Sequence, residues 1–311
     1  MPPITKAAID VGTNSVRLLV AVTSSGKITQ RLHQLATVTG LGRERSADGS
    51  LSAASQSRTL AVIKEYGATI RRLDIADVRA ATTSAVRNAP NGPEFVERVR
   101  SETGIDLAVI SGAREGLLTF RGATSDIEAT SDCLVIDIGG GSTEFSWGKA
   151  GTNPQVISLE LGCVQLREDI LIDDPPGDAR LVSAERHTVS ILERYRIPQQ
   201  LDSFRTEGLA IAVAGTPTSL VAMAMKLEPY DPKVVHGQEL TYGVITEQLA
   251  HIALLSLSEL ARIPGLQPDR APTIVAGVVI LRAIMETLGL EKIRVSERDI
   301  LDGLLVSGGR A

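Results

Sequence analysis

Apolar residues along the chain fall into short runs typical of β-strands and longer segments with helical spacing. Ala7-Ile9 and Val16-Val22 read as two strands around a tight turn. The segment that starts near Ser52, a residue suited to cap a helix, carries apolar residues at helical spacing from Leu60 to Leu73. Segments of both kinds alternate, which predicts an α/β protein.

The rest of the chain continues this alternation. Further strands are expected at 78–81, 107–110, 209–214 and 293–295, with a group of strands from 134 to about 160. Further helices are expected at 93–103, after 111–112, at 162–171, at 179–196, after 215 and at 299–306. The polar stretch 123–132, made mostly of small residues, suits a connection between two domains, and 173–177 is a loop.

One strand-turn-strand segment occurs twice. "AAIDVGTNSVRLLV" at 7–20 and "LVIDIGGGSTEFSW" at 134–147 can be laid over each other without a gap. Asp10 then falls on Asp137, and the turn of small polar residues follows each of them. Seven residues after each aspartate the charges are opposite, with Arg17 in the first copy and Glu144 in the second. The match predicts two equivalent hairpins in two halves of the protein.

Both turns have the composition of a phosphate-binding loop. Successive backbone N–H groups form an anion-binding concavity, and glycine lets phosphate oxygens approach the main chain. Carboxylates at the ends of the turn suit Mg²⁺, which takes oxygen ligands and bridges to phosphates. A pair of ordinary hairpin turns is the alternative. The candidate phosphate-binding residues of the two loops are Thr13, Asn14, Ser15, Gly139, Gly140, Gly141, Ser142 and Thr143.

Composition narrows the class of partner and the location. The formal charge is 32 − 37 = −5 and aromatic residues make up only 3%, so neither a basic field nor a base-stacking surface for nucleic acid is expected. The N-terminus lacks the layout of a signal peptide, and the apolar run Ile274–Leu281 stops at Arg282, short of a membrane span. Cys133 and Cys163 read as buried free thiols. A cytoplasmic protein without membrane contact fits these features best.

Four ordered motifs carry a family resemblance. The paired Asp-Gly loops and "AVAGTPTSL" near 212–220 resemble the actin, Hsp70 and sugar-kinase superfamily. Together with the first loop, "ATTSAVRNA", "VISGAREGLLTF" and "VIDIGGGSTEF" resemble the exopolyphosphatase/guanosine pentaphosphate phosphatase (Ppx/GppA) family, in a short two-domain form. The resemblance implies two ribonuclease H-like α/β domains facing a cleft. They would be 1–125 and 126–311, with the last helix, about 299–311, packing back on the first domain.

The resemblance also assigns chemical roles. Glu115 would be the general base, whereas from the sequence alone it could simply complement a helix dipole in the first turn. Many members carry a second acid just before this glutamate, where this chain has Arg114. Asp137 and Glu144 would hold Mg²⁺, or alternatively Mn²⁺, with Asp10 as a further ligand.

Positive charge for the phosphates would come from two arginines. Arg17 and Arg87 would bind phosphate, although either could be a solvated surface residue and many members have His at position 17. Gly215 and Thr216, at a strand end, would be a third contact with phosphate or with a nucleotide, although Pro217 is equally explained as a helix start.

The activity implied is that of an exopolyphosphatase. It would hydrolyse the terminal phosphate of inorganic polyphosphate, with preference for short chains, and release orthophosphate. Guanosine pentaphosphate (pppGpp) is the alternative substrate within the family. A rival of another class is a non-catalytic sensor that binds a nucleotide or polyphosphate without turnover. The family also suggests a homodimer.

Overall fold

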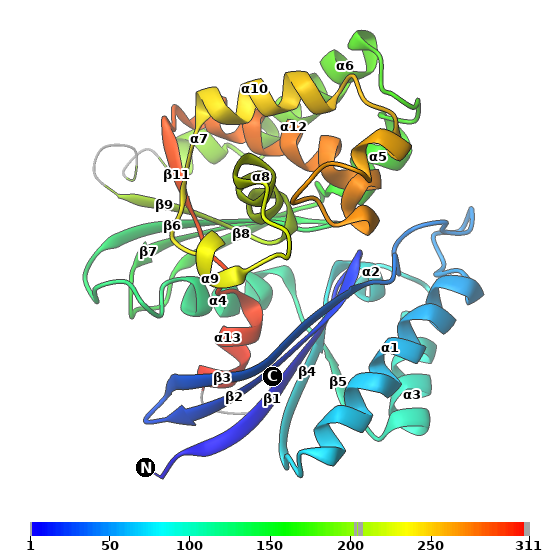
Figure 1. The fold of residues 1–311 in the computed structure, drawn as a ribbon, viewed down its shortest axis with the longest axis vertical. Coiled ribbons are helices and arrows are strands. Elements are labelled where there is room, and N and C mark those ends of the chain that lie inside the picture. The colour runs from blue at the N-terminus through cyan, green and yellow to red at the C-terminus, as the bar shows by residue number, and fades with distance from the viewer. Residues whose placement is uncertain (1, 202–203, 205–207, 308–311) are drawn as a thin grey trace. The chain divides into compact units, whose positions relative to one another are not determined.

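The computed structural model describes residues 2–201, 204 and 208–307. The chain divides into two compact units, which are described separately below. Unit 1 comprises Met1–Ser125 and Asp299–Ala311, and unit 2 comprises Asp126–Arg298. Each unit is built on one mixed β-sheet with helices packed against it (Figure 1).

The sheet of unit 1 has five strands in the order β3-β2-β1-β4-β5. Its first three strands are antiparallel, and β4 and β5 run parallel to β1. The strands are β1 (Ile4–Val11), β2 (Ser15–Ser24), β3 (Lys27–Val38), β4 (Asp77–Thr82) and β5 (Leu107–Val109). The sequence predicted four of them and missed β3.

Helices cover both faces of this sheet, as the period-2 pattern of its strands requires. Ile9 and Val11 belong to a core shared with α1 (Ala53–Arg72) and α3 (Gly92–Thr103). Ala8 and Leu19 belong to a second core shared with α4 (Gly112–Ala123) and α13 (Ile300–Val306). The short helix α2 (Ser84–Arg87) follows β4.

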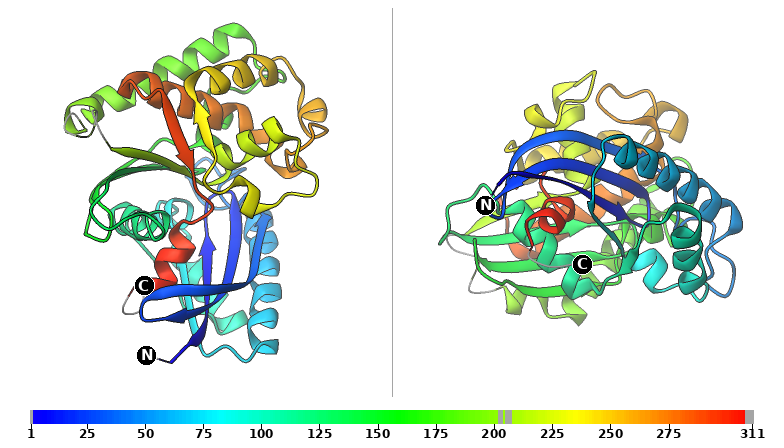
Figure 2. Two further views of the ribbon diagram at one scale, coloured as in Figure 1. Left: turned by 60° about the vertical axis from the view of Figure 1, so that its left-hand side comes forward. Right: turned by 90° about the horizontal axis from the view of Figure 1, so that it is seen from below.

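The C-terminal helix α13 is fixed tightly inside unit 1, beside β1, β2 and α4 (Figure 2). A Cβ atom on Gly122 would lie 1.8 Å from the Asp299 carbonyl oxygen, and one on Gly303 would lie 2.0 Å from that of Leu118. The two glycines therefore let α4 and α13 approach to backbone contact. Four arginines from other elements of the unit, Arg17, Arg31, Arg79 and Arg121, bind residues at 299–307.

Unit 2 repeats the strand order of unit 1. Its sheet has the order β10-β11-β9-β6-β7-β8. Strands β8, β7, β6, β9 and β11 therefore follow one another as β3, β2, β1, β4 and β5 do in unit 1, and β10 is an additional strand at the edge. The strands are β6 (Asp132–Ile138), β7 (Thr143–Lys149), β8 (Gln155–Leu159), β9 (Leu209–Val213), β10 (Glu239–Thr241) and β11 (Lys292–Val295). This duplication confirms the predicted α/β fold class.

The helices of unit 2 pack around one long apolar helix, α12 (Ala271–Leu288). The others are α5 (Cys163–Asp169), α6 (Asp178–Arg194), α7 (Ile197–Gln200), α8 (Gly215–Met225), α9 (Pro232–Val235), α10 (Tyr242–Ile252), α11 (Leu257–Leu260) and the 3₁₀ turn η2 (Pro268–Arg270). Cys133 and Cys163 are both buried.

Helix α12 is longer than the apolar run that the sequence showed, which stopped at Arg282. The continuous helical stretch Pro268–Leu288 has the length and composition of a membrane span, because the helix continues beyond Arg282. However, 78% of its apolar window is buried inside the protein. Its hydrophobicity is therefore that of a core helix.

Candidate functional site

The first predicted phosphate loop joins β1 to β2, and the carbonyl groups of Thr13, Asn14 and Ser15 accept hydrogen bonds. Gly12 N donates to Ser15 O at 3.0 Å and closes the turn. Asn14 O accepts from two backbone N–H groups, and Thr13 O accepts from Gly42 N at 2.8 Å. Among the residues the structure describes, no group accepts a hydrogen bond from the N–H of Thr13 or Asn14. The loop therefore keeps donors for an anion.

Asp10, at the start of this turn, is a buried carboxylate with one unsatisfied oxygen. The residue is 5% exposed, and its Oδ2 accepts from Arg17 Nε at 3.1 Å and Nη2 at 2.7 Å. Its Oδ1 is buried without a hydrogen-bond partner in the described part of the chain. Burial raises the pKa of the Asp10 carboxyl, and the neighbouring Arg17 opposes that shift. An orphaned oxygen of this kind suits a cation or a bound water.

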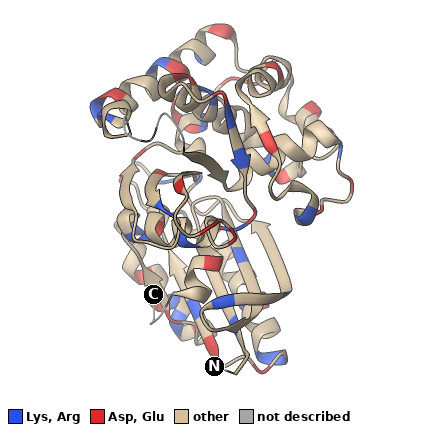
Figure 3. Ribbon diagram, turned by 90° about the vertical axis from the view of Figure 1, so that its left-hand side faces the viewer, with Lys and Arg blue, Asp and Glu red and all other residues tan. Residues whose placement is uncertain are grey.

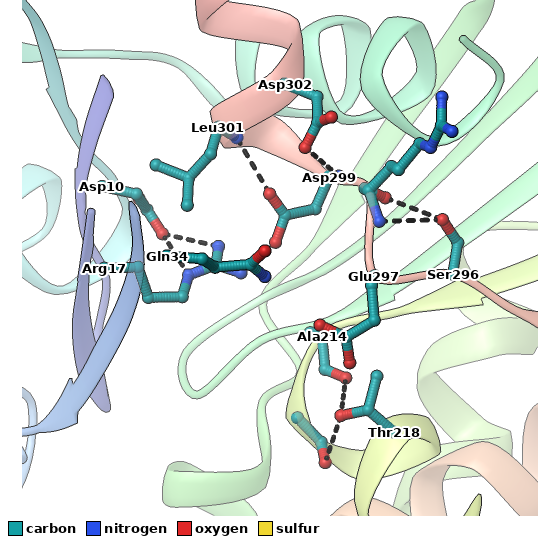
Figure 4. A network of polar contacts seen from close by, with 12 residues as sticks. Asp10, Arg17, Gln34, Ala214, Thr218, Ser296, Glu297, Asp299, Leu301 and Asp302 are labelled. Atoms are coloured by element: carbon teal, nitrogen blue, oxygen red, sulfur yellow. Dashed lines mark hydrogen bonds and ion pairs between the residues drawn. The ribbon is translucent and has the colours of Figure 1, made fainter. Parts of the chain in front are cut away.

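Arg17 lies between two carboxylates. Besides Asp10, it forms an ion pair with Asp299, the N-cap of α13 (Figure 4). Asp299 Oδ1 in turn accepts from Leu301 N at 2.9 Å. The structure thus places Arg17 as a link from the first hairpin to α13, with its charge offset by carboxylates, and this position does not favour the predicted phosphate contact.

Glu115 and Arg87 come together in unit 1. Arg87 Nη1 donates to Ile110 O at 2.8 Å and lies 3.4 Å from Glu115 Oε2. Glu115 is buried in the first turn of α4, a helix capped by the Ser111 side chain. The neighbouring Arg114 is only partly buried. Arg87 thus places a positive charge beside a buried carboxylate, whose ionised form can accept a proton.

The second loop, in unit 2, has the same turn as the first. Gly139 N donates to Ser142 O at 2.9 Å, which is the equivalent of the Gly12–Ser15 bond. Gly140 O accepts from Val164 N at the start of α5, and a Cβ atom on Gly162 would lie 2.2 Å from that oxygen. Gly139 O likewise accepts from Cys163 N at 3.0 Å, so the loop is fixed against α5 through the carbonyl groups of Gly139 and Gly140.

The hydroxyl side chains of the second loop, those of Ser142 and Thr143, are buried. Thr143 is fully buried and its Oγ1 donates to Leu161 O at 2.6 Å, so this hydroxyl holds the loop. Ser142 is buried as well, at the position equivalent to Ser15.

Strand register confirms the repeat read from the sequence. Asp10 lies opposite Arg17 across β1 and β2, and Asp137 lies opposite Glu144 across β6 and β7. Asp137 and Glu144 are both buried, and Glu144 Oε1 accepts from Ser158 at 2.7 Å. The first unit thus has an ion pair where the second has two carboxylates.

The carboxylates suit a cation that needs few protein ligands. Within residues 2–201, 204 and 208–307, no three or more His, Cys, Asp or Glu side chains form a metal-binding cluster. Mg²⁺ usually takes only one or two carboxylates together with water and substrate phosphates. Within unit 2 the buried pair Asp137 and Glu144 fits such a cation. Within unit 1 the orphaned oxygen of Asp10 is a separate candidate ligand.

The third predicted contact, Gly215 and Thr216, opens α8 directly after β9. Ala214 before it has φ 72° and ψ −169°, which is strained for an alanine. Thr218 Oγ1 donates to Ala214 O at 3.0 Å (Figure 4). A Cβ atom on Gly215 would lie 1.6 Å from Arg270 Nη1, so the Arg270 side chain rests on this glycine.

Two arginines near the predicted loops were missed from the sequence. Arg270 packs on Gly215, and Arg43 donates to Asn14 Oδ1 at 2.7 Å. Basic and acidic residues otherwise alternate over the elements of each unit (Figure 3). Positive charge at the loops therefore comes from individual arginines brought there by folding, and the only sequence signal was the run "GLGRER" after β3.

Comparison with known proteins gives one consistent family. The model of the Ppx/GppA phosphatase family matches residues 19–309. Exopolyphosphatase 2 of Mycobacterium tuberculosis is 31% identical over 314 residues, covering 97% of each chain. A solved Ppx/GppA enzyme of Aquifex aeolicus is 31% identical with a TM-score of 0.81, covering 99% of this chain and all of the other. A solved exopolyphosphatase-like protein is 27% identical with a TM-score of 0.88, covering 98% of both.

Proposed function

The chain belongs to the Ppx/GppA phosphatase family, and we propose that it is an exopolyphosphatase. It hydrolyses the terminal phosphoanhydride bond of inorganic polyphosphate and releases orthophosphate. The observation that carries this proposal is the Glu115–Arg87 pair, a buried carboxylate held at 3.4 Å from a guanidinium in the family's motif. The match to exopolyphosphatase 2 over 97% of both chains supports the substrate class.

The residues of unit 1 supply the groups that hydrolysis requires. A water oxygen bonds to the terminal phosphorus while the bridging P–O bond breaks, and the leaving chain is one phosphate shorter. Glu115 accepts the proton of the attacking water. Arg87 and the open N–H groups of the 12–15 loop stabilise negative charge on phosphate oxygens.

A divalent cation belongs to this proposal. Within unit 2, Asp137 and Glu144 would hold Mg²⁺, or Mn²⁺ in its place. Within unit 1, Asp10 is a separate candidate ligand for such an ion. When bound, the ion neutralises charge on the transferring phosphoryl group. The chain's own residues then orient the phosphates and hold the proton acceptor.

The proposal is tested by measuring phosphate release from four substrates, each with and without Mg²⁺: short polyphosphate, long polyphosphate, pppGpp and ATP. Mg²⁺-dependent release from polyphosphate, with a higher kcat/KM than for pppGpp, is the expected result. A higher kcat/KM for pppGpp would assign the chain to the other branch of the family. Binding of polyphosphate without release from any substrate would show a sensor and overturn the proposal.

A further inference from the structure

The segment 39–43 lies directly on the first phosphate loop. Thr39 N and Gly40 N both donate to Asn14 O at 2.9 Å, and Gly42 N donates to Thr13 O at 2.8 Å. A Cβ atom on Gly42 would lie 2.3 Å from Thr13 Cγ2, so a side chain at this position would displace that of Thr13. The segment therefore occupies the carbonyl groups of residues 13 and 14 and leaves their N–H groups open.

Arg43 completes this arrangement at the side chain of Asn14. Arg43 N donates to Gly40 O at 3.0 Å and closes a turn, in which Gly40 has φ +61°. A Cβ atom on Gly40 would lie 2.9 Å from Arg43 Cδ, so the stem of Arg43 folds over this glycine. Its guanidinium then reaches Asn14, where Nη2 donates to Oδ1 at 2.7 Å.

This contact decides which way the Asn14 amide faces. A guanidinium has only donors, so the atom facing Arg43 has to be the amide oxygen. The NH₂ group of Asn14 therefore points to the other side, where it can donate to an anion. All acceptors of Asn14, backbone and side chain, are occupied by the 39–43 segment, and its donors are left for a phosphate.

We propose that Arg43 is a positioning residue for phosphate binding, acting through Asn14. It fixes the carboxamide with its NH₂ group toward a phosphate oxygen of the substrate and so sets the apparent affinity for the phosphate chain rather than the rate of the chemical step. This inference rests on the proposed function, since it assigns the 12–15 loop to the substrate phosphates.

A double-mutant cycle tests the coupling. Arg43→Met removes the donor at similar length, Asn14→Ala removes the amide, and KM for short polyphosphate is measured for the parent, both single variants and the double variant. Each single variant should raise KM about tenfold, with kcat within about twofold of the parent. The KM of the double variant should be no higher than that of Asn14→Ala alone. An unchanged KM in Arg43→Met would overturn the proposal. So would a double variant whose increase in KM is the product of the increases in the two single variants.

Two conservative variants separate positioning from folding. Arg43→Lys keeps a donor and should restore most of the lost affinity. Asn14→Asp keeps an acceptor for Arg43, so its melting temperature should equal that of the parent. It lacks the NH₂ donor and should therefore still raise KM. Full affinity of Asn14→Asp would contradict the proposed role of the amide.

Arg45 is the matched control because it lies in the same loop and its Nη2 donates to Ala85 O at 3.2 Å. Arg45→Met should change KM by the same factor in the parent, which has Asn14, as in the Asn14→Ala variant. Orthophosphate binding to the Glu115→Gln forms of all these proteins gives a readout independent of turnover. A parent that releases no phosphate would defeat the proposed function alone, whereas an active parent without coupling would defeat only this inference.

Discussion

At the scale of single residues, Arg87 gives a direct test of the proposed function. It donates to Ile110 O and lies beside Glu115, so it both orients the carboxylate and brings charge to it. Arg87→Met should lower kcat by about 100- to 1,000-fold, because a preorganised donor at developing charge is lost. Steady-state phosphate release measures this. Arg100, an exposed arginine of the same unit, is the control, and an Arg87→Met variant as active as Arg100→Met would refute the role.

Asp10 gives a prediction about pH. Burial raises the pKa of its carboxyl, against the opposing effect of Arg17, so the folded chain binds this proton more tightly than the unfolded chain does. The stability that this proton contributes is fully present below the unfolded-state pKa and is lost as pH rises through the folded-state pKa.

The D10N variant, which cannot ionise at this position, isolates that contribution. The free energy of unfolding of D10N minus that of the parent should increase as pH rises above the ordinary carboxyl pKa. It should stop increasing once pH has passed the folded-state pKa of Asp10. Denaturant titrations at a series of acid to neutral pH values give the difference. A difference that is constant, or that moves the other way, would contradict the assignment.

Asp137 tests the proposed metal site. Asp137→Asn should raise the Mg²⁺ concentration for half-maximal activity by about 10- to 100-fold, since one ionised oxygen ligand is lost. Asp169→Asn, at an exposed position on α5 of the same unit, should leave the Mg²⁺ titration unchanged. Equal Mg²⁺ requirements in the two variants would remove Asp137 from the site.

At the scale of elements, the close contact between α4 and α13 can be tested by measuring the stability of variants. A methyl group on Gly303 would lie 2.0 Å from the Leu118 carbonyl oxygen, in the helix that carries Glu115. Gly303→Ala should therefore lower the free energy of unfolding by about 1–3 kcal/mol through overpacking. Gly243→Ala in α10, where the added atom would make only an ordinary contact, 3.9 Å from Thr241 Oγ1, should be neutral or stabilising. Equal unfolding curves for the two variants would show that α13 does not pack as described.

Elements were predictable where the sequence carries a local signal. Ser52 caps α1 with its side chain, as its position indicated, and α4 begins after Ser111 as expected. Helix α3 ends at Thr103, as expected, and Gly104 follows in the left-handed region. Strand β3 gave no such signal, because it is an edge strand with most residues exposed and therefore lacks an apolar run.

Contacts between distant segments could not be predicted in this way. Arg17 reaches Asp299, 282 residues further on, and Arg43 reaches Asn14 across β2 and β3. Neither pair shows in the local pattern of its own segment. The motifs therefore located the loops and Glu115, while the partners that orient these groups became visible only in the fold.

At the scale of the molecule, two units with the same strand order carry matched hairpins with different charges. Unit 1 offers an open donor loop, Arg87 and the buried Glu115, whereas unit 2 offers a glycine loop with two opposed carboxylates. The net charge of −5 gives no general attraction for a polyanion, so recognition has to come from these local groups. At the register position opposite the aspartate, the two hairpins carry opposite charges, Arg17 in unit 1 and Glu144 in unit 2.

The most direct measurement of the central claim compares the parent with Glu115→Gln, using orthophosphate release from short polyphosphate in Mg²⁺ and polyphosphate binding by calorimetry. The account predicts release by the parent, and a loss of about 100-fold or more in the variant with binding retained, because only the proton acceptor is removed. A Glu115→Gln variant that hydrolyses polyphosphate as fast as the parent would contradict it.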